Sequence, residues 1–199
     1  MKTTIFTIIA ASIATLSSSA FASTTLNTIG SFNAIEVHGN VELVVANGDK
    51  NNVELNNDYY AQNAMVQNSN GTLRIASYTA EKLVVYVTAN DLRSIEAFDN
   101  ASVKSDGRLS AIAMEVSLHN NAYAALNLDN FSATVTVDDA AKADISGSVT
   151  EYAFNHSLSS VINQAALVAD NRAEKVIMPV VIAKAAQANN NDDLLVIAD

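Results

Sequence analysis

The amino-acid sequence predicts an all-β fold, a parallel β-helix built as a solenoid with coils of about 20 residues. Apolar and polar residues alternate at a spacing of two over most of the chain, the pattern of strands with one buried face. Polar corner segments also recur at a nearly constant interval, which is typical of a repeat architecture. A β-sandwich, the alternative fold, does not require corners at such an interval.

The composition limits the possible function classes. The 199 residues include no Cys and no Trp, and 21 Asp+Glu stand against 11 Lys+Arg, for a formal charge of -10. Without Cys the chain cannot form disulfides, thiolate zinc sites or iron-sulfur clusters. The acidic balance argues against nucleic acid as a partner, because phosphate binding needs clustered basic side chains.

Residues 1–22 have the features of a signal peptide. A basic start at Lys2 precedes an apolar run from Ile5 to Leu16, and small residues end at Ala20-Phe21-Ala22. The run is too short for a membrane-spanning helix. We expect cleavage after Ala22, no membrane span in the remaining chain, and a location in the periplasm or on the cell surface of a Gram-negative bacterium.

The strands follow in order from Ser31 onward. Their inward-facing residues are predicted to be Ile35 and Val37, then Val41, Leu43 and Val45, then Leu83, Val85 and Val87, then Ile95 and Ala97, then Met114, Val116 and Leu118, then Ala122, Ala124 and Leu126, then Val135 and Val137, then Ala143 and Ile145. At most one short helix is expected, at Asp58–Gln67, where Asp58 can serve as the N-cap. Ile182–Ala188 is a second candidate.

The repeats lie in the second half of the chain. Four corners lie 21, 19 and 20 residues apart: Asp99-Asn100-Ala101, Asn120-Asn121-Ala122, Asp139-Ala140-Ala141 and Ser159-Ser160-Val161. Asn and Asp tolerate the left-handed backbone of tight turns, and small Ala residues let a coil close. We expect a ladder of corner Asn residues that stabilises the stack.

These patterns predict a single domain over residues 31–199. It consists of N-terminal strands at 31–92, repeated coils at 93–175 and a closing strand pair at 176–199, which we expect to cap the open edge of the solenoid.

Three segments resemble the family known as the putative autotransporter adhesin head GIN domain, a bacterial exported domain of unknown function. They are Phe32–Leu55, Asn70–Ile75 and Leu83–Val103, and with the coils that follow the resemblance covers about Ser31–Asn171. Ala89 stands where family members carry a Pro. The resemblance implies a right-handed parallel β-helix in the cell envelope, and it implies no catalytic residue.

Several side chains invite a chemical role. Asp138-Asp139 could act as a pair of glycosidase carboxylates, but adjacent strand residues point to opposite faces, so a solvated turn is favoured. Stacking could bring His119 and His156 together as metal ligands with Asp138 or Asp139, the alternative being exposed corner histidines, and His38 is the third imidazole.

Calcium has candidate ligands at Asp99, Asp106, Asp129, Asp138, Asp139 and Asp144, but the calcium-binding glycine repeat is absent. We interpret the glycosylation sequons at Asn70, Asn100, Asn130 and Asn155 as turns. We predict no catalytic, cofactor-binding or metal-binding residues.

The sequence therefore predicts a non-enzymatic envelope protein whose flat faces bind a surface glycan or an envelope protein through repeated weak contacts. One alternative is a periplasmic structural or regulatory partner domain, favoured by the lack of a second module. A second alternative is a carbohydrate-active β-helix enzyme that uses Asp138 and Asp139.

Overall fold

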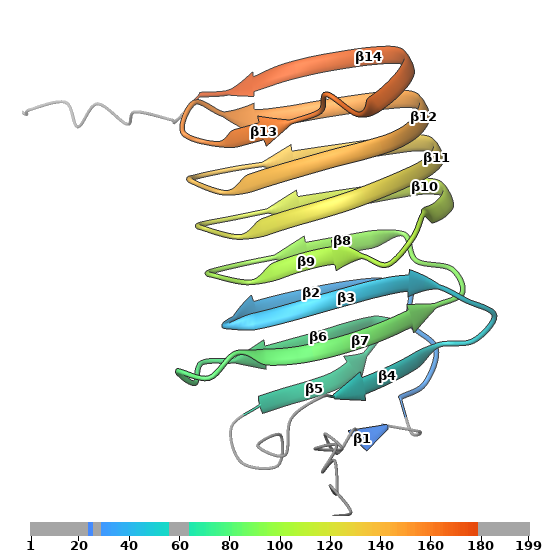
Figure 1. Ribbon diagram of the computed structural model, residues 1–199, viewed down its shortest axis with the longest axis vertical. Helices are drawn as coiled ribbons and strands as arrows, with labels where there is room; N and C mark the ends of the chain where they lie inside the picture. The colour runs from blue at the N-terminus through green and yellow to red at the C-terminus, as the bar shows by residue number, and fades with distance from the viewer. Residues whose placement is uncertain (1–23, 26–28, 56–63, 179–199) are drawn as a thin grey trace, which may run out of the picture.

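The computed structural model describes residues 24–25, 29–55 and 64–178, and in these residues it is all-β, without a helix (Figure 1). The strands are β1 (Thr24–Thr25), β2 (Ala34–Gly39), β3 (Val41–Asn47), β4 (Asn52–Leu55), β5 (Ala64–Ser69), β6 (Thr72–Ser77), β7 (Leu83–Ala89), β8 (Ser94–Ala97), β9 (Ser102–Ser105), β10 (Leu109–Leu118), β11 (Tyr123–Val137), β12 (Lys142–Ser157), β13 (Val161–Asn163) and β14 (Leu167–Ile177).

These strands form one curled, mostly parallel sheet in which the chain returns beside itself at a nearly constant interval (Figure 1). Val116 lies opposite Ile95, 21 residues earlier, and opposite Val135, 19 residues later. The long strands β11 and β12 run in parallel register from Tyr123 opposite Lys142 to Val137 opposite His156. Each strand–corner–strand unit, called a coil below, therefore stacks on the previous coil, as the spacing of the corners predicts.

The first coils do not stack in chain order. β2 and β3 lie between β6 and β7 on one side and β8 and β9 on the other. Ile35 is thus opposite Ile95, a residue 60 positions away, as well as opposite Leu73. The sheet continues without a break across residue 93, where the recognisable sequence repeat begins.

The prediction of a helix at Asp58–Gln67 is wrong for residues 64–67, the part of this segment that the structure describes. Residues 64–67 belong to β5, which pairs antiparallel with β6. Asn70 and Gly71 connect the two strands with φ of 53° and 82°. Two adjacent left-handed residues make the tight hairpin turn that an Asn-Gly sequence favours, and pairing with β6 outweighs the weak helical pattern.

Three sequence predictions fall wholly or partly outside the described residues. They are the signal peptide at 1–22, the second helix candidate at Ile182–Ala188, and the closing strand pair at 176–199, of which Val176 and Ile177 end β14. In the part of the chain that the structure describes, no helix has the length and hydrophobicity to cross a bilayer.

The core lies between the two sides of each coil and is made of continuous inward-facing rows. Val37, Ala97, Leu118 and Val137 form one such row and are fully buried. The predicted inward residues Ile35 to Ile145 are all buried. Apolar burial contributes about 25 cal/mol per Å² removed from water, so each row stabilises its register as well as the fold.

We expect Leu118→Ala to lower the free energy of unfolding by about 2 to 5 kcal/mol, because it leaves a cavity in a row that cannot collapse. Urea unfolding followed by circular dichroism measures the change. Ser117→Ala, on the outer face of the same strand, should change it by about 0.5 kcal/mol or less. Equal effects from the two variants would contradict the assignment of the inner row.

Candidate functional site

One edge of the stack carries a repeated corner built from residues that accept a left-handed backbone. Gly39, Asp99, Asn120 and Asp139, here called the corner row, have φ of 78°, 59°, 59° and 53°. Among residues with a side chain, Asn and Asp enter this region most readily. Gly is required at 39, because a Cβ there would lie 2.1 Å from the carbonyl oxygen of Ser77.

Three of the four corners are closed by a buried alanine. The N–H groups of Ala101, Ala122 and Ala141 each donate to the carbonyl oxygen three residues earlier, at 3.1 Å. These alanines are fully buried, so a larger side chain would not fit inside the turn. The prediction that small residues let the coil close is confirmed.

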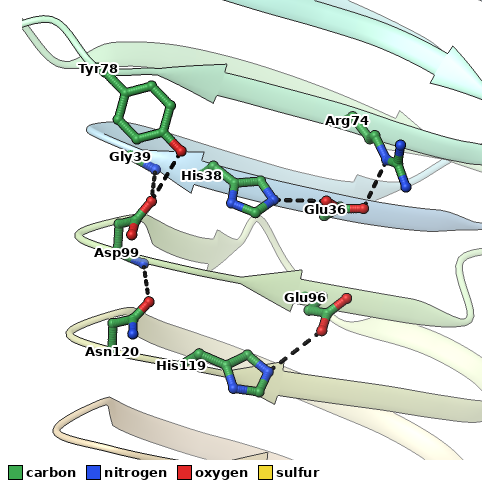
Figure 2. Close-up of polar contacts among 9 residues, drawn as sticks. All are labelled: Glu36, His38, Gly39, Arg74, Tyr78, Glu96, Asp99, His119 and Asn120. Atoms are coloured by element: carbon green, nitrogen blue, oxygen red, sulfur yellow. Dashed lines mark hydrogen bonds and ion pairs between the residues drawn. The ribbon is translucent and has the colours of Figure 1, made fainter.

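The side chains of the corner row connect neighbouring coils (Figure 2). The N–H of Gly39 donates to Asp99 Oδ2 at 3.1 Å, and the N–H of Asp99 donates to Asn120 Oδ1 at 3.1 Å. The N–H of Asn120 in turn donates to Asp139 Oδ2 at 3.0 Å. Each side chain thus satisfies an N–H of the previous coil. The expected ladder of corner Asn residues is corrected to a mixed ladder, in which Asn120 is flanked by Asp99 and Asp139.

Three aromatic rings, here called the ring stack, lie beside the corner row. The rings of His38 and Phe98 are stacked at 4.4 Å between centroids, and those of Phe98 and His119 at 4.8 Å. Figure 2 shows each imidazole beside a glutamate, with His38 Nε2 2.8 Å from Glu36 Oε1 and His119 Nε2 3.5 Å from Glu96 Oε1. The stack holds the two imidazoles rigidly on the outer surface.

The structure does not bring His119 and His156 together. His119 stacks on Phe98, whereas His156 lies in the inward row opposite Val137 and stacks on Phe154 at 4.9 Å. The register places His119 beside Asp138 and His156 beside Val137. Because adjacent strand residues point to opposite sides, the two imidazoles lie on opposite faces of the sheet. The suggested metal site at these two histidines is therefore wrong.

The six aspartates considered for calcium are not gathered either. Asp99, Asp138 and Asp139 are in the corners, and Asp106 directly follows β9. Asp129 lies 3.9 Å from Arg108, and Asp144 accepts a hydrogen bond from the hydroxyl of Tyr123 at 2.6 Å. Among the described residues no group of three or more acidic or histidine side chains could hold a metal ion.

The adjacent carboxylates Asp138 and Asp139 serve the corner itself. Asp138 Oδ1 accepts the N–H of Asp139 at 2.8 Å, and Asp139 Oδ2 accepts that of Asn120. A hollow of about 570 Å³ opens beside them, lined by Asp138, Asp139, Ser157, Leu158, Ser159, Ile177 and Met178. Its two carboxylates are thus committed to backbone groups, which favours a turn over a glycosidase pair.

The prediction that the glycosylation sequons lie in turns is wrong for two of the four. Asn70 and Asn100 are in turns, as expected, but Asn130 lies in β11 and is 6% exposed, and Asn155 lies in β12. Both Asn130 and Asn155 lie within alternating apolar and polar residues, and this pattern could have indicated a strand.

A different surface, whose members were not predicted from the sequence, gathers hydroxyl and amide groups. Ser117, Thr136 and Asn155 lie opposite one another on β10, β11 and β12, and Thr134 lies two residues before Thr136 on the same face. All four are half-buried. These residues, here called the hydroxyl patch, repeat at the strand spacing of about 4.8 Å.

Comparisons with known proteins agree with this architecture. A family model described as "putative auto-transporter adhesin, head GIN domain" matches residues 31–176. A solved structure from Parabacteroides distasonis, described as a "putative adhesin", has a TM-score of 0.58 and 16% identity over 78% of this chain and 77% of that one. A second from the same organism, described as a "putative lipid binding protein", has a TM-score of 0.56 and 13% identity over 78% of each chain. At such identities the likeness shows the fold alone, and no curated protein matches this chain.

We expect Asn120→Ala to lower the free energy of unfolding by about 1 to 3 kcal/mol, because it strains a left-handed residue and removes the acceptor for the Asp99 N–H. Asn120→Gly removes only the acceptor and should cost about half as much. Asn121→Ala, on an exposed neighbour, is the control. If Asn120→Gly and Asn120→Ala unfold at the same urea concentration, the left-handed backbone is not the source of the effect.

Glu36 makes the stability depend on pH. Its hydrogen bond with His38 and, to a smaller extent, its contact with Arg74 at 2.9 Å hold the pKa of the Glu36 carboxyl below its usual value, while burial opposes them. A carboxyl with a lower pKa in the folded state stabilises the fold above its unfolded pKa, about 4.3. This contribution is lost as the pH falls through the pKa of the folded state.

We therefore expect Glu36→Gln to be less stable than the wild type at neutral pH, by about 1 kcal/mol or less for a partly exposed ion pair, and to match it near pH 3. Thermal unfolding from pH 3 to pH 7 measures the difference. Glu115→Gln, which removes an exposed carboxylate from the same face, is the matched control. A wild-type advantage that does not change with pH would contradict the role of the Glu36 charge.

Proposed function

The chain belongs to the family described as "putative auto-transporter adhesin, head GIN domain", and we propose that it is an exported, non-enzymatic binding module of the bacterial cell envelope that recognises a surface glycan. The family match extends over residues 31–176, from before β2 to the penultimate residue of β14. Adhesion is named in the description of the family and of a solved structure with the same fold.

The hydroxyl patch is the observation that carries this proposal. Ser117, Thr136 and Asn155 form one line across three coils, with Thr134 beside it, and the parallel register keeps their side chains on one face. Hydroxyl and amide groups can both donate and accept hydrogen bonds, as glycan hydroxyl groups do. A flat, regular row of such groups suits an extended polymer better than a compact small molecule.

Repetition compensates for weak individual contacts. Each coil contributes one or two polar side chains to the face, so a polymer that lies across several coils makes several contacts at once. Linked weak contacts raise the overall affinity because later contacts form at a high effective concentration. The rigid corner row supports this mode of binding, since it fixes the spacing between coils.

Export and the handedness of the stack complete the proposal. The basic, apolar and small-residue segments of residues 1–22 support export to the periplasm or to the cell surface. The parallel registers with 19 to 21 residues between partners support a parallel β-helix. Connections between parallel strands of one sheet are nearly always right-handed, which supports the right-handed form.

The experiment is a binding assay with purified protein immobilised at high density, probed with an array of neutral and acidic glycans and with collagen and fibronectin. We expect a glycan to bind, and Thr136→Lys to weaken that binding roughly tenfold by placing a bulky charge in the hydroxyl patch. Val161→Lys, an exposed strand position outside the hydroxyl patch, is the matched control and should bind normally.

Circular dichroism must show the same fold for both variants. Failure of the wild type to bind any glycan at any density would overturn the proposal, and so would equal weakening by both variants.

A further inference from the structure

The last strand of the stack has an edge that is open to solvent. β14 pairs in parallel with β12 from Gly147 opposite Leu167 to Ser157 opposite Ile177, and it lies at the C-terminal end of the stack (Figure 1). In the described ranges 24–25, 29–55 and 64–178, no strand pairs with its other edge. The exposed backbone groups of such an edge can pair with another strand.

The inward side of β14 is charged where that of β12 is apolar. Arg172 lies opposite Tyr152 and Glu174 lies opposite Phe154, and the two aromatic side chains are 2% and 4% exposed. Arg172 and Glu174 are nevertheless exposed themselves, as are all residues from 170 to 176. Inward-pointing charges on an edge strand restrict which strands can be added to it.

The order of these charges is self-complementary. Residues 171–175 read Asn-Arg-Ala-Glu-Lys. If two copies of β14 pair antiparallel with Ala173 at the centre, Arg172 of each lies opposite Glu174 of the other on the inward side. On the outward side Asn171 lies opposite Lys175. Opposite charges in directly facing positions stabilise an antiparallel pair.

Neighbouring registers lack this match. An antiparallel pair centred on Arg172 places two arginines opposite each other, and one centred on Glu174 places two glutamates opposite each other. A parallel, in-register pair places two arginines opposite each other and also two glutamates opposite each other. Like charges in facing positions are destabilising, so these pairings are disfavoured. A pair centred on Asn171 places Asp170 opposite Arg172 but leaves Glu174 opposite Val168, whereas the pair centred on Ala173 gives both Arg172 and Glu174 a partner of opposite charge.

We propose that β14 is a dimerisation strand, which pairs antiparallel with β14 of a second copy of this chain about a twofold axis at Ala173. This contact goes beyond the proposed glycan binding and does not use the hydroxyl patch. The interface is the same surface on both copies, so the pair closes on itself and does not extend into a fibre. The dimer doubles the number of binding faces.

Contacts inside one copy hold the two charged side chains in place. The guanidinium carbon of Arg172 lies 5.7 Å from the centre of the Tyr152 ring, and Glu174 Oε1 lies 3.0 Å from His156 Nε2. Both side chains are thereby ordered over the inner row before a partner arrives, which lowers the entropy cost of association.

The test measures the mass of the full-length purified protein over a concentration series, by light scattering after size exclusion. We expect a dimer whose dissociation constant rises roughly tenfold or more in Arg172→Glu and in Glu174→Arg, because each places like charges opposite each other twice. An equimolar mixture of these two variants should dimerise, since every facing pair is then opposite in charge, and so should the double variant. Lys142→Glu is the control for the charge change alone.

Ala173→Arg is a second disrupting variant that leaves Arg172 and Glu174 intact, and it places two arginines across the axis. Circular dichroism checks the fold of each variant. The proposal is overturned if the wild type is monomeric at every concentration, or if the single variants dimerise as well as the wild type. A truncation after Met178 that turns a monomer into a dimer would also overturn it, by showing that the chain's own C-terminal residues occupy the edge.

Discussion

The structure depends on one backbone constraint, which is that four successive coils turn through the same tight corner with a residue in the left-handed conformation. Asp99, Asn120 and Asp139 satisfy it at φ of 59°, 59° and 53°. The side chains that tolerate this backbone also accept the N–H of the previous coil, so one residue sets both the turn and the register between coils. A slip by one residue would turn every inward side chain outward.

The register fixed at the corners decides what each face presents. On the inside it aligns Val37, Ala97, Leu118 and Val137 into a buried row. On the outside it aligns the ring stack and the hydroxyl patch, which come from segments far apart in the chain. A repeated fold of this kind provides regular surfaces, and the proposed function uses that property.

The two ends of the stack differ in the strands that form them. At the N-terminal end the chain reverses, and the antiparallel strands β4 and β5 cover the edges of β7 and β6. At the C-terminal end β14 carries exposed charges of alternating sign. Among the described strands β5 is itself the last at its end of the sheet, so both ends have an edge, and only that of β14 carries charges of alternating sign.

The sequence by itself determined the all-β class, the inward residues and the corners at intervals near 20, because alternation and local turn chemistry are encoded within a few neighbouring residues. The Asn70-Gly71 hairpin was also encoded locally, although the Asp58–Gln67 helix pattern was preferred to it. Only the tertiary structure decided that β2 lies between β6 and β8, with Ile35 beside Ile95, and that His119 and His156 face opposite sides. The order of stacking and the meeting of side chains depend on which strands pair over long distances, and that choice is made by the burial and hydrogen bonding of the whole stack.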